Sequence, residues 1–230
     1  MDGSANGNPN ETEYAFQRER LVSDQLARRN ITDERVLQAM RQVPRHIFVR
    51  VDDLAFAYAD GPLPIGSGQT ISQPYIVALM TQMLELLGHE TVLEVGTGSG
   101  YQAAVLAQVA RQVHTIERHA DLAETSRRIL QGLAYTNVQV HVGDGSLGLP
   151  QHAPYQAILV TAAAPQVPQP LLEQLDEGGY LVLPVGGRGM QSLERWQRQG
   201  DDFKREMGIP VAFVPLRGTL GWHGNWWEPD

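Results

Sequence analysis

Apolar residues recur along this chain with two spacings, and the alternation between them predicts its fold. Short runs rich in β-branched residues are typical of buried strands. Such runs occupy 92–95, 113–116, 138–142, 157–160 and 180–183. Between them lie stretches with the composition or spacing of helices. These stretches cover 101–110, 121–133 and 170–175. Strands that alternate with helices predict an α/β fold with a parallel, doubly wound sheet.

The chain before the first strand is expected to be mainly helical. The spacing of apolar residues predicts helices over 13–29, 31–44 and 73–88. Thr32 and Ser72 are the expected N-caps of the second and third helices, because a side-chain oxygen there accepts hydrogen bonds from free N–H groups of the first turn. Residues 58–69 form a Gly- and Pro-rich loop, which is either a connector or part of a functional site.

Two further strands are predicted at 192–198 and 211–216. They follow one another without a helix between them, so we expect them to pair antiparallel.

No linker or internal repeat divides the sequence. We therefore expect one domain over 13–217, with N-terminal helices and a loop in 13–90 and a cofactor-binding core in 91–217. The composition of residues 1–12 predicts disorder. Residues 218–230 form a Trp-rich tail, which is a disordered end, a packed arm or a surface for a partner.

One predicted strand ends in a turn that contains three glycines. Residues 91–100 read T-V-L-E-V-G-T-G-S-G and lead from that strand into a helix. Glycine lets a ligand approach the main chain, and the free N–H groups of the helix start can bind it. Glu117 ends the next strand, where an acidic side chain can bind a ribose. The turn alone also fits a tight connection without a ligand, but with Glu117 it predicts a nucleoside cofactor in a Rossmann-like fold.

A third strand is followed by Gly143-Asp144-Gly145. The carboxylate of Asp144 could accept a hydrogen bond from an exocyclic amine such as that of adenine. Asp-Gly is also common in ordinary turns, so this assignment stays open at the level of the residues.

Composition excludes several classes of function. The formal net charge is −8, from 26 acidic and 18 basic residues, which argues against a broad nucleic-acid surface. The chain has no cysteine, so thiolate nucleophiles and Cys-ligated zinc are excluded, and we expect no metal site. There is neither an apolar run long enough to span a membrane nor a secretory signal pattern, so we expect a cytoplasmic protein.

The histidines form no catalytic triad pattern with Ser72. We expect them to be surface or loop residues, namely His46, His114, His119, His141 and His152.

The chain resembles the protein-L-isoaspartate O-methyltransferases, repair enzymes that use S-adenosylmethionine. The resemblance rests on segments in family order: P-L-P-I-G-S-G-Q-T-I-S-Q-P, V-L-E-V-G-T-G-S-G-Y-Q-A-A-V-L-A, I-E-R, N-V-Q-V-H-V-G-D-G, A-I-L-V-T-A-A-A and G-G-Y-L-V-L-P-V-G. The Q-T-I-S-Q-P segment is the specific one, because many methyltransferases share the glycine motif. The first ten residues and the Trp-rich tail lie outside the resemblance.

The resemblance implies a Rossmann-like S-adenosylmethionine-dependent methyltransferase fold. It places the methionine part of the cofactor beside the glycine turn, the ribose on Glu117 and the adenine near Asp144. It assigns Ser72 as the active-site residue. The implied cofactor-binding residues are Thr70, Ile71, Glu94, Gly96, Thr97, Gly98, Ser99, Gly100, Glu117, Asp144 and Gly145.

The implied reaction methylates the free α-carboxylate of an L-isoaspartyl residue, so that the succinimide can reform and reopen as normal aspartate. The implied partners are isoaspartyl proteins and peptides, and we expect a monomer without nucleic-acid or membrane partners. A carboxylate is already ionised near neutral pH, so the reaction needs no catalytic base. The Ser72 hydroxyl can orient that carboxylate through a hydrogen bond.

Other functions fit parts of the sequence. A DNA amino-methyltransferase usually has an Asn/Asp-Pro-Pro-aromatic motif after its fourth strand, where this chain has T-A-A-A. A methyltransferase for another small molecule or another protein carboxylate stays possible. The G-x-G-x-G spacing disfavours a dehydrogenase. A non-catalytic cofactor-binding protein, with a partner on the Trp-rich tail, is distinguished from an enzyme by a turnover assay.

Overall fold

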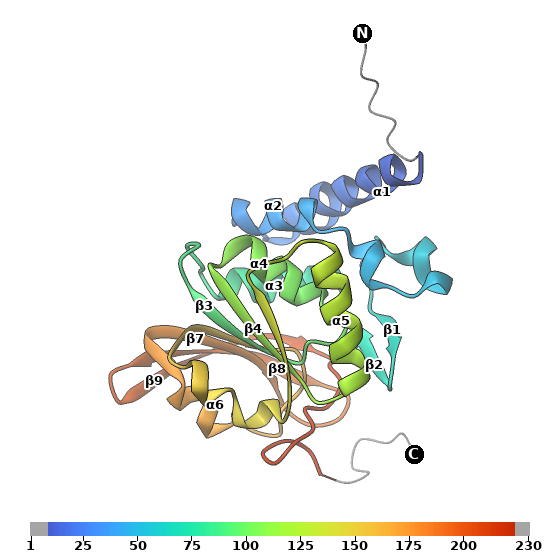
Figure 1. Ribbon diagram of the computed structural model, residues 1–230. Coiled ribbons are helices and arrows are strands. Elements are labelled where there is room, and N and C mark those ends of the chain that lie inside the picture. Colours follow the sequence, from blue (N-terminus) through green and yellow to red (C-terminus); the bar gives the residue numbers. More distant parts are fainter. Residues whose placement is uncertain (1–8, 224–230) are drawn as a thin grey trace.

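The structure, a computed structural model, describes residues 9–223 of the chain (Figure 1). Its main sheet has the strand order β5-β4-β3-β6-β7-β8-β9. These strands are β3 (Thr91–Val95), β4 (Gln112–Glu117), β5 (Val138–Val142), β6 (Tyr155–Val160), β7 (Leu175–Val185), β8 (Gln191–Gln199) and β9 (Asp202–Val211). Strands β3 to β7 are parallel, and β8 runs antiparallel to both neighbours. The expected Rossmann-like α/β fold, with its antiparallel C-terminal strand, is confirmed.

Helices cover both faces of this sheet (Figure 1). They are α1 (Pro9–Arg20), α2 (Glu34–Gln42), α3 (Pro74–Met83), α4 (Tyr101–Val109), α5 (Ala120–Gly132) and α6 (Gln169–Glu173). Val92 of β3 packs with α2 to α5 in one apolar cluster, whereas the next residue, Leu93, packs with α6 in a second cluster. Because both faces are buried, the central strands are continuous apolar runs, which is why the sequence revealed them.

The N-terminal helix begins earlier than the sequence predicted. Residues 9–12 are helical rather than disordered, while residues 1–8 lie outside the described part. Glu11 ties this first turn to the domain, with its carboxylate 3.4 Å from Nε2 of the buried His46. Beyond α1 the chain continues as a π-helix (Leu21–Leu26) and a 3₁₀ turn (Ala27–Arg29).

Both predicted N-caps are wrong. The N-cap of α2 is Asp33, whose Oδ1 accepts a hydrogen bond from the Arg35 N–H at 2.9 Å. The N-cap residue of α3 is Gln73, which makes no side-chain capping bond. Its role is taken by Asp60 from the preceding loop.

Asp60 stabilises the start of α3 from a distance in sequence. Its Oδ1 accepts a hydrogen bond from the Tyr75 N–H at 2.9 Å, and its Oδ2 accepts one from Gln73 Nε2 at 2.8 Å. Arg29 forms an ion pair with the same carboxylate. The helix then ends at Met83, five residues before the expected Gly88, and residues after it turn back toward β3.

The Gly- and Pro-rich loop contains regular structure. Strands β1 (Leu63–Gly66) and β2 (Gln69–Ile71) pair antiparallel as a small hairpin beside the main sheet. Short 3₁₀ turns complete the described chain at Arg45–Phe48, Val51–Phe56, Gly145–Leu147 and Pro150–His152.

The predicted strand over 211–216 is also wrong. The edge strand is β9, which ends at Val211, and residues 202–209 carry few buried side chains. An edge strand pairs through its backbone, so a mostly polar sequence conceals it. Residues 212–216 instead cross the carboxyl ends of the parallel strands, where the Ala163 N–H donates to Val214 O at 2.8 Å.

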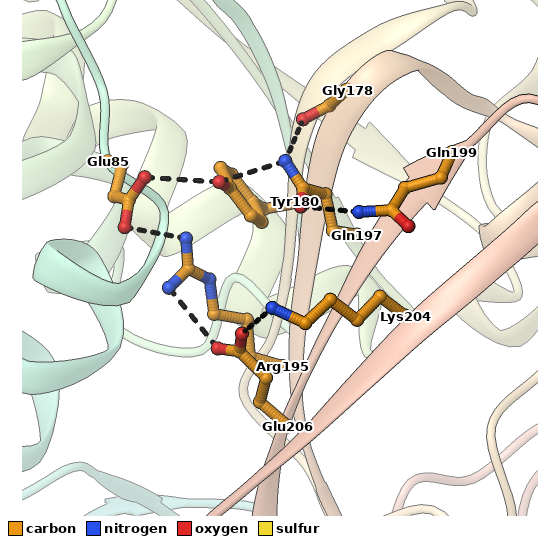
Figure 2. Close-up of polar contacts among 8 residues, drawn as sticks. All are labelled: Glu85, Gly178, Tyr180, Arg195, Gln197, Gln199, Lys204 and Glu206. Atoms are coloured by element: carbon orange, nitrogen blue, oxygen red, sulfur yellow. Dashed lines mark hydrogen bonds and ion pairs between the residues drawn. The ribbon is translucent and has the colours of Figure 1, made fainter.

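A polar cluster ties the antiparallel strands to the segment after α3 (Figure 2). Arg195 of β8 lies 3.8 Å from the ring centroid of Tyr180 of β7 and pairs with Glu85 at 2.7 Å. It also pairs with Glu206 of β9 at 3.5 Å. Tyr180 Oη donates to the second oxygen of Glu85 at 3.1 Å. One guanidinium therefore joins two strands and the loop before β3.

Within residues 9–223, none of the helices has the length and apolar character needed to cross a membrane.

Candidate active site

The turn after β3 adopts a backbone that glycine enters easily. Gly96, Gly98 and Gly100 have φ values of 97°, 52° and 89°. A Cβ on Gly96 would lie 2.4 Å from Oγ1 of Thr161, at the end of β6. The Thr161 hydroxyl donates to the Gly96 carbonyl at 2.6 Å. The turn then enters α4, whose first N–H groups have no partners inside the helix.

Glu117 reaches the glycine turn from the neighbouring strand. Its Oε2 accepts a hydrogen bond from the Gly98 N–H at 3.0 Å, and its Oε1 accepts one from the His119 N–H at 2.9 Å. The parallel strands β3 and β4 end at the same edge of the sheet, which brings these residues together. Each carboxylate oxygen has a further lone pair, so Glu117 can still accept from two ligand hydroxyls.

Glu94 supports the glycine turn through a chain of hydrogen bonds. It is completely buried, and its Oε2 accepts a hydrogen bond from Thr115 Oγ1 at 2.5 Å. Thr115 in turn shares a 2.6 Å hydrogen bond with Thr97 of the turn. Burial raises the pKa of Glu94 to about 8, against the Thr115 hydrogen bond and with the help of the Glu117 charge. The carboxyl is therefore mostly protonated near neutral pH.

The neighbouring residues Asp144 and Gly145 face different parts of the structure. A Cβ on Gly145 would lie 2.5 Å from Cγ1 of Val95, so only glycine fits against β3 here. Asp144 faces the C-terminal segment, where its Oδ1 accepts from the Ser146 hydroxyl at 2.6 Å and its Oδ2 from the Thr219 N–H at 2.7 Å. Burial alone would raise the pKa of Asp144, but these hydrogen bonds lower it. The expected contact between Asp144 and adenine stays a prediction.

A cleft opens at this edge of the sheet, where ligands bind in open α/β folds. We call it the main cleft. The predicted site residues that line it are Thr70, Ile71, Ser72, Gly96, Thr97, Gly98, Ser99, Glu117 and Gly145. Glu94 lies beneath the floor, Gly100 packs toward Ser126 of α5, and Asp144 lines a separate hollow beside the C-terminal segment.

A second cleft adjoins the first, and we call it the side cleft. It lies between the start of α3, the turn from β7 to β8 and residues 210–214. Its apolar lining includes Phe213 and Met190, of which Met190 is 71 % exposed. The residues that line both clefts are Thr70, Ser72, Thr161 and Val214. Two molecules bound in the two clefts would therefore meet beside Ser72 and Thr161.

Ser72 is held at this junction through its backbone. Its carbonyl accepts a hydrogen bond from Arg45 Nη1 at 3.0 Å, and its hydroxyl has no hydrogen-bond partner among residues 9–223. Arg45 is completely buried, and it also donates to the carbonyls of Ala57 at 2.8 Å and Gly61 at 3.2 Å. Burial lowers the pKa of Arg45, with opposing contributions from Tyr101 and other groups.

Sequence reasoning missed Arg45 and Thr161. A single arginine outside any motif gives no local signal, since its role depends on three carbonyls up to 27 residues away. Thr161 could have been found, because it follows a parallel strand, and ligand sites gather at such strand ends.

The expectation for the histidines is wrong for His46 and His114, which are buried. His46 stacks on Tyr14 with ring centroids 4.0 Å apart, and its Nδ1 lies 2.8 Å from Tyr58 Oη. Burial lowers the pKa of His46. His114 lies on β4 near two other histidines, where sequence spacing gave no motif.

The residues of the main cleft fit S-adenosylmethionine. The glycine turn lines this cleft beside the start of α4, where the first N–H groups have no partners inside the helix. Glu117 offers carboxylate oxygens at the position where a ribose binds in folds of this type. Gln102 and His119 add further polar groups to the lining.

Comparison with known proteins agrees with this geometry. The sequence model of the protein-L-isoaspartate(D-aspartate) O-methyltransferase family matches residues 16–221. The chain is 53 % identical over 210 residues to a protein-L-isoaspartate O-methyltransferase of Roseiflexus sp., covering 91 % of this chain and 96 % of the relative. It is 56 % identical over 207 residues to one of Syntrophobacter fumaroxidans, covering 90 % and 97 %. The match reaches residue 221 and so includes the start of the tail, which the sequence resemblance had left out.

Solved structures are similar as well. A protein-L-isoaspartate O-methyltransferase superposes with a TM-score of 0.80 at 28 % identity, covering 89 % of this chain and 67 % of the other. A Plasmodium falciparum protein described as the same enzyme, in complex with S-adenosyl-L-homocysteine, gives 0.75 at 25 % identity, covering 87 % and 98 %.

Proposed function

Since this chain belongs to the protein-L-isoaspartate(D-aspartate) O-methyltransferase family, we propose that its main cleft holds S-adenosylmethionine and its side cleft the isoaspartyl substrate. The enzyme transfers a methyl group to the free α-carboxylate of L-isoaspartyl residues in damaged proteins and peptides. One observation supports the assignment of cofactor and substrate to different clefts. The two clefts meet at four shared residues, Thr70, Ser72, Thr161 and Val214.

We assign the cofactor to the main cleft because of the polar groups that line this cleft. Glu117 would accept hydrogen bonds from the ribose hydroxyls, and the turn from Gly96 to Gly100 would hold the methionine part. Gly145 would leave space for the adenine. Glu94 acts through Thr115 and Thr97, because it has no surface on the cleft and supports the turn from beneath.

The chemistry requires alignment rather than proton transfer. When bound, S-adenosylmethionine supplies a methyl group already activated by a sulfonium. The substrate carboxylate is ionised near neutral pH and needs no base. The Ser72 hydroxyl, which has no partner among the described residues, donates a hydrogen bond that orients this carboxylate. Arg45 positions Ser72 through its carbonyl. Holding the reacting groups in the right orientation can account for a large part of the reduction in the activation free energy.

Two peptides that differ only in isoaspartate against aspartate test the substrate. We expect methyl transfer to the isoaspartyl peptide and essentially none to the aspartyl peptide. Equal labelling of both, or labelling of DNA or RNA alone, would contradict the proposal.

Ser72→Ala tests the junction. Since Ser72 does not cap α3, this variant should melt close to the parent. A hydrogen bond to a charged group is worth about 1.5–3 kcal/mol, so kcat/KM should fall roughly ten- to a hundredfold. Ser23→Ala, remote from both clefts, is the matched control. Parental kcat/KM in Ser72→Ala would remove Ser72 from the mechanism.

Glu117→Ala tests the cofactor side. Calorimetry with S-adenosyl-L-homocysteine should show affinity weaker by roughly ten- to a hundredfold, while Ser72→Ala binds it nearly as the parent does. An unchanged dissociation constant in Glu117→Ala would disprove the ribose contact.

We also propose that the enzyme acts as a cytoplasmic monomer without nucleic-acid partners, with one catalytic domain over 13–217. The net charge of −8 opposes binding to a polyanion.

A further inference from the structure

Three histidines from separate elements gather on the α6 side of the sheet. His114 lies on β4, His141 on the neighbouring β5, and His152 in the 3₁₀ turn 150–152 that covers them. One ring nitrogen of each lies within 4.8 Å of those of the other two. His114 is buried, whereas His141 and His152 are half-buried and reach solvent. None of the three lines the main cleft or the side cleft.

The spacing of these nitrogens is close to that of a metal site. Nδ1 of His114 lies 3.2 Å from Nε2 of His141. Two imidazole nitrogens on a tetrahedral Zn²⁺, at about 2.0–2.1 Å from the metal, lie roughly 3.3–3.4 Å apart. The ring of His152 stacks on that of His114 with centroids 4.2 Å apart. His152 belongs to a short surface turn, so a small movement of one side chain would bring the third nitrogen to ligand distance.

The surroundings keep the imidazoles available as ligands. Burial, with His152 and His141 adding to it, lowers the pKa of His114 to about 4. Burial likewise lowers the pKa of His141, with Arg127 adding to the effect. Arg127 itself pairs with Glu124, which partly neutralises its charge. Neutral imidazole is the form that binds Zn²⁺, Ni²⁺ and Cu²⁺.

We propose that His114, His141 and His152 form a binding site for one divalent transition-metal ion, with Zn²⁺ as the preferred occupant. Three neutral nitrogen ligands leave a fourth position for water. The ion would join β4, β5 and the 150–152 turn, and would stabilise the fold without taking part in methyl transfer. The alternative is a stack of imidazoles held by the hydrogen bond between His114 and His141.

Metal titration of the full-length, untagged protein distinguishes the two. We expect calorimetry with ZnCl₂ to give one ion per chain, and Co²⁺ to give the visible absorption of a low-symmetry site. Zn²⁺ should raise the melting temperature of the parent. His141→Asn and His152→Asn should each weaken Zn²⁺ binding at least about tenfold, as the loss of groups around a metal does. Both positions reach solvent, so these variants should fold, which circular dichroism and parental methyl transfer would verify.

His89→Asn is the matched control, because His89 is an exposed histidine outside the cluster. It should bind Zn²⁺ as the parent does. Absence of stoichiometric binding to the parent, or binding unchanged in both cluster variants, would overturn the metal site and leave the imidazole stack.

Discussion

Glu94→Gln should make the cofactor-free enzyme relatively more stable as the pH rises. Burial raises the pKa of Glu94 from 4.5 to about 8, with the Thr115 hydrogen bond opposing and the Glu117 charge adding. Below pH 4.5 the carboxyl is protonated in both folded and unfolded chains. Between these values the unfolded chain releases the proton and the folded chain retains it, so the free energy of unfolding falls with pH.

The size of the effect follows from the same values. At 1.36 kcal/mol per pH unit, the difference between 4.5 and about 8 corresponds to about 5 kcal/mol, which is an upper limit. Residual structure in the unfolded chain reduces it, so we expect about 2–4 kcal/mol between pH 5 and pH 8. Glutamine cannot ionise. Its amide N–H₂ would occupy the position of the unpartnered Oε1, at a pH-independent cost of about 1–3 kcal/mol.

Urea unfolding of parent and variant at several pH values from 5 to 8, without cofactor, is the assay. The quantity to compare is the change with pH in the difference between the two unfolding free energies, because the constant cost of the amide cancels. Glu90→Gln is the matched control, because the pKa shift of Glu90 has the opposite sign. Burial alone would raise the pKa of Glu90, but hydrogen bonds from the Leu87 and Gly88 N–H groups lower it. The pH-dependent change of that variant relative to the parent lies below pH 4.5, so between pH 5 and pH 8 the difference between Glu90→Gln and the parent should stay nearly constant. Parallel curves for Glu94→Gln and the parent would refute the reasoning.

Three further substitutions test the framework of the site. Asp60→Ala should lower the free energy of unfolding by about 1–2 kcal/mol, because α3 loses its cap, whereas Asp60→Asn should keep most of it; urea titration measures both. Gly96→Ala should lower the free energy of unfolding by about 1–3 kcal/mol, because alanine is strained at φ 97° and its Cβ would contact Thr161. Adding Thr161→Ala should recover part of this loss. Full stability in Gly96→Ala would contradict the packing. Arg195→Ala should lower the free energy of unfolding by about 1–2 kcal/mol, because the guanidinium no longer stacks on Tyr180. In a double-mutant cycle the coupling energy between Arg195 and Glu85 should stay below about 1 kcal/mol, since Glu85 is 57 % exposed. A larger coupling energy would show that the ion pair dominates.

The sequence by itself determined most strands of the parallel sheet and predicted that the glycine turn and Glu117 bind the cofactor. The strands β3, β4, β5 and β6 were predicted to within about two residues. Strands β3 and β6 are buried on both faces and form continuous apolar runs, whereas β5 is an edge strand that alternates valine with polar residues. The glycine turn and Glu117 were recognised for a related reason. Their spacing follows from one strand, one turn and the next strand, and parallel strands must end at one edge of the sheet.

Tertiary structure alone decided the features that depend on distant partners. Serine is a common N-cap residue, but at the start of α3 the Tyr75 N–H donates to Asp60 instead. The Ser72 hydroxyl therefore has no partner among the described residues. Asp144 sits at a strand end as expected, yet Thr219, 75 residues later, donates to its carboxylate.

The same holds for residues that no local pattern marks. Arg45 is buried because three carbonyls converge on it, and β9 pairs through its backbone while its side chains stay polar. The cluster of His114, His141 and His152 forms because two adjacent strands and a covering turn meet there. Local periodicity records which face of an element is buried. It does not record which polar groups, far apart in the chain, come within hydrogen-bonding or ligand distance once the sheet has formed.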